Sequence, residues 1–515
     1  MMKGYPFIIF FWRQGIIPSL IHPCGYHYTD SPDFVPYLNP QKVGNEESFF
    51  EILIGFREND GETGGEPAKG GNPMKRYLSV LLAVLLLLGC LSGCGEKTTL
   101  DPNEPVTLTM WHVYGEQADS PMNRLVAEFN ATVGQEKGIL VTVTNVTSTS
   151  KISAQLEAAM AGAPDAPEMP DLFSTHTNTV EELGTEKLLD WNTCFSEDEL
   201  KNYVPEFLED GTMDGKLAVF PVSKSTYALF LNGSRFERFS ADTGVTYESL
   251  STWEGFFDAA AKYYDWSDGK PFCAFDYLIR HIEFDVMSKD GALEYTEDGW
   301  YDLQNPSLEE SWMKFARSLA QGHIVVSDQY SNTQVMTGET LGGIGSTAAI
   351  TYYNDTVTYP DNTSEPTNLK VLPLPRTGDG EQYMPMTGVG LSAYATTEQK
   401  AEAAAVFVRW LTEGERNLDF VVETGYMPVN NDAFEAIEGY EFPDAGYASL
   451  FDAIKTMRDG YTPVVRPAFG GYYDKVDALY EGLRQMQPEL RERSDNGESA
   501  DILAKEIWDF FCSVQ

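Results

Sequence analysis

The chain has 515 residues, 42% of them hydrophobic and 13% aromatic, which is enough for about two to four domains with proper cores. Its formal net charge of −42, from 36 Lys and Arg against 78 Asp and Glu, would repel a phosphate backbone or an anionic membrane surface. These numbers argue against nucleic acid as a partner and indicate a solvated acidic surface that keeps an exported protein soluble.

An export signal is predicted inside the chain, over residues 74–94. Lys75-Arg76 precede the apolar run 77–88, and a charged start, a short apolar core and a small-residue exit are typical of such signals. The run is too short to span a membrane as a mature helix. At its end, Leu91-Ser-Gly-Cys94 resembles a bacterial lipobox, in which the Cys becomes the lipidated first residue.

We therefore predict lipidation of Cys94, with Leu87-Leu-Gly-Cys90 as a weaker second match, and a polar tether over 95–104. Such a lipid would hold the protein at the outer face of the bacterial cytoplasmic membrane without crossing it. Residues 1–73 show no sustained helical or strand period. Because an export signal belongs at the start of a chain, we interpret 1–73 as an upstream extension that is not translated.

Three cysteines lie in the exported body, Cys194, Cys273 and Cys512. They are far apart in sequence and form no C-x-x-C spacing, so they indicate neither a metal site nor a disulfide framework. Buried free thiols are the expected state.

The first elements alternate between strand and helix. Ser120 and Pro121 supply an N-cap and a first helical position, and the following apolar residues recur at helical spacing. The predicted order is strand 106–111, helix from 121, strand 139–143, helix 152–161, strand 170–173 and helix 180–189. This alternation predicts a mainly parallel sheet covered on both faces.

A crossover between two domains is predicted next. Asp214-Gly215 is a tight-turn dipeptide, 217–220 is a short buried strand, and Pro221 cannot donate to a central ladder. The apolar strand 227–231 follows and ends at Asn232. This pattern resembles the first crossover of the family-1 extracellular solute-binding proteins, the carbohydrate-type receptors of ABC importers.

Later motifs extend the resemblance to the C-terminus. The segment 336–346, with its Gly-Glu turn and Gly-Ser end, resembles a strand of that family, as does the loop 425–430. Capping boxes at Ser251 and Ser307 predict helices to 264 and about 320, and one at Thr396 predicts a helix to 411. The remaining predictions are a strand over 369–374 and helices over 448–457, 472–485 and 500–511.

The resemblance implies an α/β, two-lobe, periplasmic-binding-protein-like fold of type II. Each lobe is a mainly parallel sheet flanked by helices, and the chain crosses between the lobes about three times. We place 105–224 and 375–462 in the N-terminal lobe, and 225–374 and 463–515 in the C-terminal lobe. No repeat of 20–50 residues is visible, which argues against solenoids and propellers.

Motifs for catalysis or cofactors are absent from the sequence. The six His residues form no H-E-x-x-H, and no phosphate loop or G-x-S-x-G is present, so no enzyme, metal or cofactor is predicted. Gly343-x-Gly345-x-x-Ala348 lacks the βαβ unit of a dinucleotide fingerprint. The abundant carboxylates leave a secreted glycoside hydrolase as an alternative, beside a surface glycan adhesin.

A sugar-binding cleft needs flat aromatic surface and planar polar groups. The resemblance places such residues in the first lobe after two strands, at the crossover, and at the return of the chain. Trp111 could equally be core, and Lys224 could meet an anion or be a solvated hinge residue. The first-lobe and crossover candidates are Trp111, His112, Tyr114, Glu116, Thr175, His176, Asn178, Ser223, Lys224, Ser225, Thr387 and Gly388.

The second lobe contributes the rest of the predicted site: Tyr227, Ser346, Thr347, Phe469, Tyr472 and Tyr473. Tyr472 is the predicted stacking aromatic, although helix packing is an open alternative for both C-terminal tyrosines. The resemblance implies a monomeric receptor that closes on a small solute, most often an oligosaccharide. It also implies a pair of ABC permease subunits and their ATPase as partners.

Overall fold

The computed structural model describes residues 98–114, 120–296, 300–394, 397–465 and 472–514, except for six side chains. These six side chains are Thr149, Ser150, Asn178, Glu181, Glu182 and Tyr473. All described residues belong to one compact unit, 94–515. Within them, no helix is both long and apolar enough to cross a bilayer.

The first sheet has the strand order β2-β1-β3-β15-β6, and one strand, β15, runs against the others. Its strands are β1 (Val106–His112), β2 (Ile139–Val146), β3 (Leu172–Thr175), β6 (Phe220–Ser225) and β15 (Thr387–Ala393). Strand β6 lies at the edge, where Pro221 needs no ladder partner for its nitrogen. The alternation of apolar residues in β1 places Leu108 and Met110 in the core.

The second sheet has the order β13-β7-β10-β8-β9, and again one strand, β7, runs against the others. Its strands are β7 (Tyr227–Leu231), β8 (Cys273–Phe275), β9 (Ile324–Val325), β10 (Gly342–Ser346) and β13 (Lys370–Leu372). A short ribbon of β14 (Tyr383–Pro385) and β16 (Thr462–Val464) pairs in parallel outside both sheets. The small hairpins are β4 (Thr212–Met213) with β5 (Lys216–Leu217) and β11 (Thr356–Thr358) with β12 (Ser364–Pro366).

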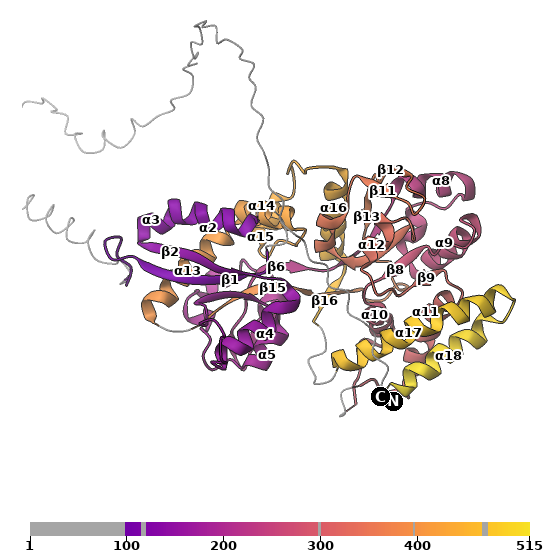
Figure 1. The fold of residues 1–515 in the computed structure, drawn as a ribbon, viewed down its shortest axis with the longest axis horizontal. Helices are drawn as coiled ribbons and strands as arrows, with labels where there is room; N and C mark the ends of the chain where they lie inside the picture. The colour runs from indigo at the N-terminus through magenta and orange to yellow at the C-terminus, as the bar shows by residue number, and fades with distance from the viewer. Residues whose placement is uncertain (1–97, 115–119, 297–299, 395–396, 466–471, 515) are drawn as a thin grey trace, which may run out of the picture. The chain divides into compact units, whose positions relative to one another are not determined.

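Helices cover both sheets (Figure 1). Those of the first lobe, defined by the first sheet, are α2 (Pro121–Ala131), α3 (Val133–Lys137), α4 (Thr149–Met160), α5 (Thr177–Leu183), α6 (Glu197–Leu200), α7 (Pro205–Asp210), α13 (Glu398–Leu411), α14 (Gly414–Thr424) and α15 (Asn431–Ala436). Those of the second lobe are α8 (Gly233–Thr243), α9 (Trp253–Trp266), α10 (Leu278–Asp290), α11 (Pro306–Ala320), α12 (Ser331–Met336), α16 (Ala445–Gly460), α17 (Tyr472–Asp495) and α18 (Ala500–Ser513). The last two lie side by side, and α18 also packs against α11.

Most predicted elements are present, and the helix caps lie at or within two positions of the predicted residues. Ser120 caps α2 with Pro121 at its first position, as predicted. Three other caps lie one or two positions away from the predicted residue: α9 is capped by Thr252, α11 by Asn305 with Pro306 behind it, and α13 by Thr397. In each case the side chain of the observed cap accepts a backbone N–H from the first turn of its helix.

Helix α16 bears on the predicted lobe boundary. The predicted boundary puts 375–462 in the N-terminal lobe, whereas α16 packs on β13 and β7 of the second sheet. The hydroxyl of Ser449 accepts the N–H of Val371 at 2.9 Å, which ties the helix to the strand. The chain therefore returns to the second sheet before residue 445.

Candidate functional site

The two sheets are joined at their carboxyl-terminal edges. Strand β6 ends at Ser225 and β7 begins at Tyr227, so a single residue, Thr226, connects them. Because β6 runs with the parallel strands of the first sheet, the chain leaves that sheet at its carboxyl edge. Because β7 runs against β10, the chain enters the second sheet at the carboxyl edge as well.

The return crossover has the same property. Strand β13 runs with β10 and ends at the carboxyl edge of the second sheet, and β15 begins at the carboxyl edge of the first. Open α/β sheets bind ligands outside the carboxyl ends of their strands. We call the region where both carboxyl edges adjoin Thr226 the junction, and it is the candidate site.

The predicted first-lobe residues meet at this junction through two contacts. The Tyr114 hydroxyl lies 2.6 Å from Oγ of Ser223, and Nδ1 of His176 lies 2.9 Å from the carbonyl oxygen of Gly388. Burial raises the pKa of the Tyr114 hydroxyl well above its usual value, so it remains a neutral hydrogen-bonding group. Thr387 pairs with Ser225 in the sheet, which places it at the same edge.

Three predicted residues lie behind this layer. Trp111 is core, with 2% of its surface exposed, and Thr175 and His112 are fully buried. The N–H of Tyr114 donates to Nδ1 of His112, so Nε2 carries the proton and donates to Asn123. Burial lowers the pKa of His112, in agreement with this neutral form. The two bonds of His112 tie the end of β1 to Tyr114 and to α2.

Lys224 is neither exposed nor unpaired. Its ammonium forms an ion pair with Asp210 of α7, and both side chains are nearly fully buried. The sequence left open an anion partner or a solvated hinge position for Lys224, and the structure shows instead a buried pair within the protein. The neighbouring Ser225 is also buried.

The second-lobe residues surround the start of β7. The Tyr227 ring stacks on Tyr277, with ring centroids 6.0 Å apart and an interplanar angle of 13°. The N–H of Thr347 donates to the carbonyl of Thr226 at 2.8 Å, and Ser346 accepts the N–H of Ala348 with its hydroxyl. The Thr226 and Thr347 hydroxyls are buried, and no described residue forms a hydrogen bond with either of them.

Tyr472 lies deeper than a surface stacking residue. Only 2% of it is exposed, and its hydroxyl donates to Glu283 at 2.9 Å. Burial raises its pKa well above the usual value. Five further predicted positions, Cys94, Glu116 and Phe469 and the side chains of Asn178 and Tyr473, lie outside the described residues.

Sequence reasoning missed three exposed tyrosines on the second lobe. Tyr277 follows β8, Tyr330 follows β9 and Tyr352 follows β10 in the chain, and these three strands are parallel neighbours. Their exposed fractions are 40%, 72% and 51%, high for so large a side chain. We call Tyr277, Tyr330 and Tyr352 the tyrosine edge. The signal that could have found them is an aromatic residue shortly after each short buried strand.

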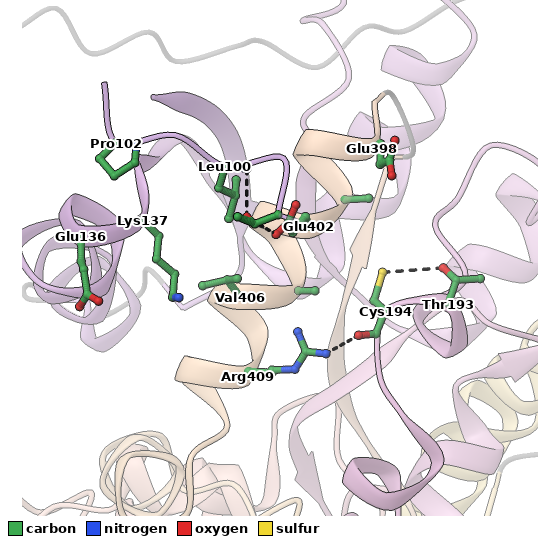
Figure 2. Close-up of a pocket in the computed structure, with 13 residues that line it drawn as sticks. Leu100, Pro102, Glu136, Lys137, Thr193, Cys194, Glu398, Glu402, Val406 and Arg409 are labelled. Carbon is green, nitrogen blue, oxygen red and sulfur yellow. Dashed lines mark hydrogen bonds between the residues drawn. The ribbon is translucent and has the colours of Figure 1, made fainter. Parts of the chain in front are cut away.

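Two cavities lie away from the junction. One of 780 Å³ is lined by residues of α13 together with Lys137, Cys194 and the segment that begins at Thr98 (Figure 2). The other, of 820 Å³, lies beside β9 and α17. None of the predicted site residues lines either cavity. Among the described residues, no cluster of His, Cys, Asp and Glu could hold a metal ion.

Comparison with known proteins gives a family and a fold. A family model described as a bacterial extracellular solute-binding protein matches residues 124–445, more than half of the chain. This match confirms the resemblance predicted from the sequence. The comparison with characterised protein sequences gives no match.

Three solved structures illustrate the fold. The cyclic alpha-maltosyl-1,6-maltose binding protein from Arthrobacter globiformis is 17% identical, with a TM-score of 0.58 over 80% of this chain and 99% of that one. UgpB from Mycobacterium tuberculosis, solved with glycerophosphocholine, is 16% identical, with a TM-score of 0.56 over 79% and 98%. The sugar-binding protein MalE from Xanthomonas citri is 16% identical, with a TM-score of 0.57 over 79% and 97%. The likeness confirms the predicted two-lobe α/β fold.

Proposed function

The chain belongs to the bacterial extracellular solute-binding protein family, and from this premise we propose that it captures a neutral oligosaccharide outside the cell for an ABC importer. The observation that carries the ligand class is the tyrosine edge. Its members follow three neighbouring parallel strands, β10, β8 and β9, at the edge where such sheets bind ligands.

The width of the tyrosine edge favours several sugar rings over one. Neighbouring strands lie about 4.8 Å apart, so the two outer strands are separated by about 10 Å. That distance exceeds the width of a single pyranose ring. Flat aromatic faces suit the apolar faces of such rings.

The charges at the junction favour a neutral ligand. Lys224 is paired with Asp210 and Arg280 with Glu283, so these two cations are already neutralised. A phosphate or carboxylate would have to compete with a buried carboxylate for either of them. UgpB, with its glycerophosphocholine, shows that the same fold also accommodates a solute that carries a phosphate group, so the proposal rests on the residues of this chain.

Binding would close the two lobes about the crossovers at Thr226 and at the β14–β16 ribbon. A ligand that contacts both carboxyl edges binds the closed form more tightly than the open one and shifts the population toward it. The partners are two permease subunits and an ATPase. We further propose a monomer, held at the membrane by a lipid on Cys94, with 1–73 not translated and with the lobe boundaries near 224 and 374.

The test is a thermal-shift screen of the wild type with maltotetraose, xylotetraose, raffinose and glucose 6-phosphate, followed by calorimetry on any ligand that binds. A neutral oligosaccharide should raise the melting temperature, because a ligand that binds only the folded state stabilises it. Tyr277→Ala and Tyr330→Ala should each weaken binding by roughly 1–3 kcal/mol. Ile502→Ala, on α18 and 55% exposed, is the matched control and should bind as the wild type does.

Two outcomes would contradict the proposal. Stabilisation by glucose 6-phosphate alone would replace the neutral ligand with an anionic one. Release of shorter sugars from the bound oligosaccharide would favour the glycoside hydrolase alternative, because a receptor returns its ligand unchanged. The family and its solved neighbours are binding proteins, which supports the receptor.

A further inference from the structure

Helix α10 buries several charged residues in the second lobe. It begins directly after Tyr277, and Arg280, Glu283 and Asp285 on it are at most 3% exposed. Charged side chains are rarely buried to this degree unless they are paired. Asp285 forms ion pairs with Lys289 and Lys314, which are less buried than it is. Arg280 and Glu283 instead pair with each other, and both are buried.

Arg280 connects α10 to the crossover ribbon. Its guanidinium pairs with Glu283 and also donates to the carbonyls of Val464 and Val465, at 3.5 and 3.3 Å. Val464 is the last residue of β16, the strand that pairs with β14 between the lobes. The crossover is thus fixed to the helix that carries Tyr277 at its start.

Glu283 connects the same helix to α17. It accepts the hydroxyls of Tyr472, the first residue of α17, and of Tyr301. Two turns further along α17, the Tyr480 hydroxyl accepts the N–H of Ile279 at 3.0 Å. Helix α17 is therefore held to the first turns of α10 at two points.

A buried ion pair of this kind contributes little net stability, because the loss of hydration offsets the attraction between the charges. Where such pairs are retained, fixing one arrangement of the surrounding elements is the best-attested use. Here the arrangement is that of β16, α17 and the start of α10, all of which adjoin the carboxyl edge of the second sheet.

Resting on the proposed function, we propose that Arg280 and Glu283 are positioning residues of the ligand site. Without touching the ligand, they hold β16 and the first turn of α17 against the helix that follows Tyr277. The part of the binding surface that the second lobe contributes is then already ordered in the free protein. Ligand binding therefore does not have to order it.

The test compares Glu283→Gln and Tyr472→Phe with Tyr203→Phe as the matched control. Tyr203 is also a buried tyrosine, and its hydroxyl bonds to Thr412 at 2.6 Å in the first lobe. The two test variants should bind maltotetraose, or whichever tetrasaccharide of the screen the wild type binds, at least tenfold more weakly. The control should bind within about twofold of the wild type at a similar melting temperature.

Two further readouts separate positioning from a general loss of stability. Amide exchange of the free protein over 462–465 and 472–480 should be faster in both test variants and unchanged in the control. The double variant should bind more weakly than either single variant, since the glutamine of Glu283→Gln can still accept the Tyr472 hydroxyl and the two changes therefore remove different contacts, the Arg280 ion pair and the Tyr472 hydrogen bond. Wild-type affinity with unchanged exchange would overturn the inference. If no saccharide binds the wild type, the proposed function fails, and the exchange experiment still decides the positioning role.

Discussion

Lys224 and Asp210 form an ion pair in which the two side chains are only 2% and 7% exposed. Lys224 is the last residue but one of β6, two positions before Thr226, which joins the two sheets, and Asp210 ends α7. The pair therefore fixes a first-lobe helix to the strand that leads into the crossover. It also removes the cation that the sequence offered to an anionic ligand.

Lys224→Met should destabilise the protein by about 3–5 kcal/mol, because it leaves the Asp210 carboxylate buried without a counter-charge. Lys224→Met combined with Asp210→Leu should recover most of that loss, since two apolar side chains no longer require hydration. Urea denaturation of the wild type and the two variants measures both effects. A loss below about 1 kcal/mol for Lys224→Met would show that water reaches this pair.

Gly345→Ala should destabilise the second lobe by about 1–3 kcal/mol, as overpacked core sites do. A Cβ at this position would lie 2.2 Å from Oδ2 of Asp276 and 2.9 Å from the Ser331 hydroxyl. Asp276 cannot simply move away, because it accepts the Ser331 N–H at 2.7 Å. Gly460→Ala is the control, since its Cβ would meet nothing within 4 Å. Equal stability of the two variants in thermal denaturation would contradict this packing.

Asp276→Asn should change how stability depends on pH. Burial raises the pKa of Asp276 from 3.8 to about 6. Between these values the folded state holds the proton more tightly, so Asp276 adds stability at low pH that is lost as the pH rises through about 6. Asn has no proton to lose, so the variant should gain about 3 kcal/mol relative to the wild type between pH 3.5 and 7.

Denaturant titrations of both proteins at several pH values measure this difference. Asn can still accept the Ser331 N–H, so the contact itself is retained. Between about pH 3.5 and 7, Asp276→Asn should become increasingly more stable than the wild type. Above about pH 7 the difference should stay constant. A difference that stays constant with pH would mean that Asp276 titrates normally in the folded protein.

The sequence predicted the alternating elements of the first lobe because each has a clear period and a local cap. It did not predict α10, since Arg280, Glu283 and Asp285 occupy buried positions and interrupt any apolar stripe. Their partners come from β16, α11 and α17, far away in the sequence. Only tertiary pairing makes this helix stable, and a single sequence does not display it.

In the candidate site, too, some features could be predicted from the sequence and others depend on tertiary packing. Strand order, strand direction and one hydrogen bond place four predicted residues at the junction: Tyr114, Ser223, Thr387 and Tyr227. Two features could not be predicted from the types of residue present, because they depend on tertiary packing. These are the burial of Trp111 and the ion pair of Lys224 with Asp210. Gly343-x-Gly345, which resembles a nucleotide fingerprint, is explained by the close approach of β10 to Ser331 of α12.

Small-angle X-ray scattering of the wild type, with and without a saturating oligosaccharide from the screen, tests the central claim most directly. If the ligand is held between the two carboxyl edges, the radius of gyration should fall on binding, and Tyr277→Ala should need more ligand to reach the same value. An unchanged radius at a ligand concentration that calorimetry shows to be saturating would contradict a receptor that closes on its cargo.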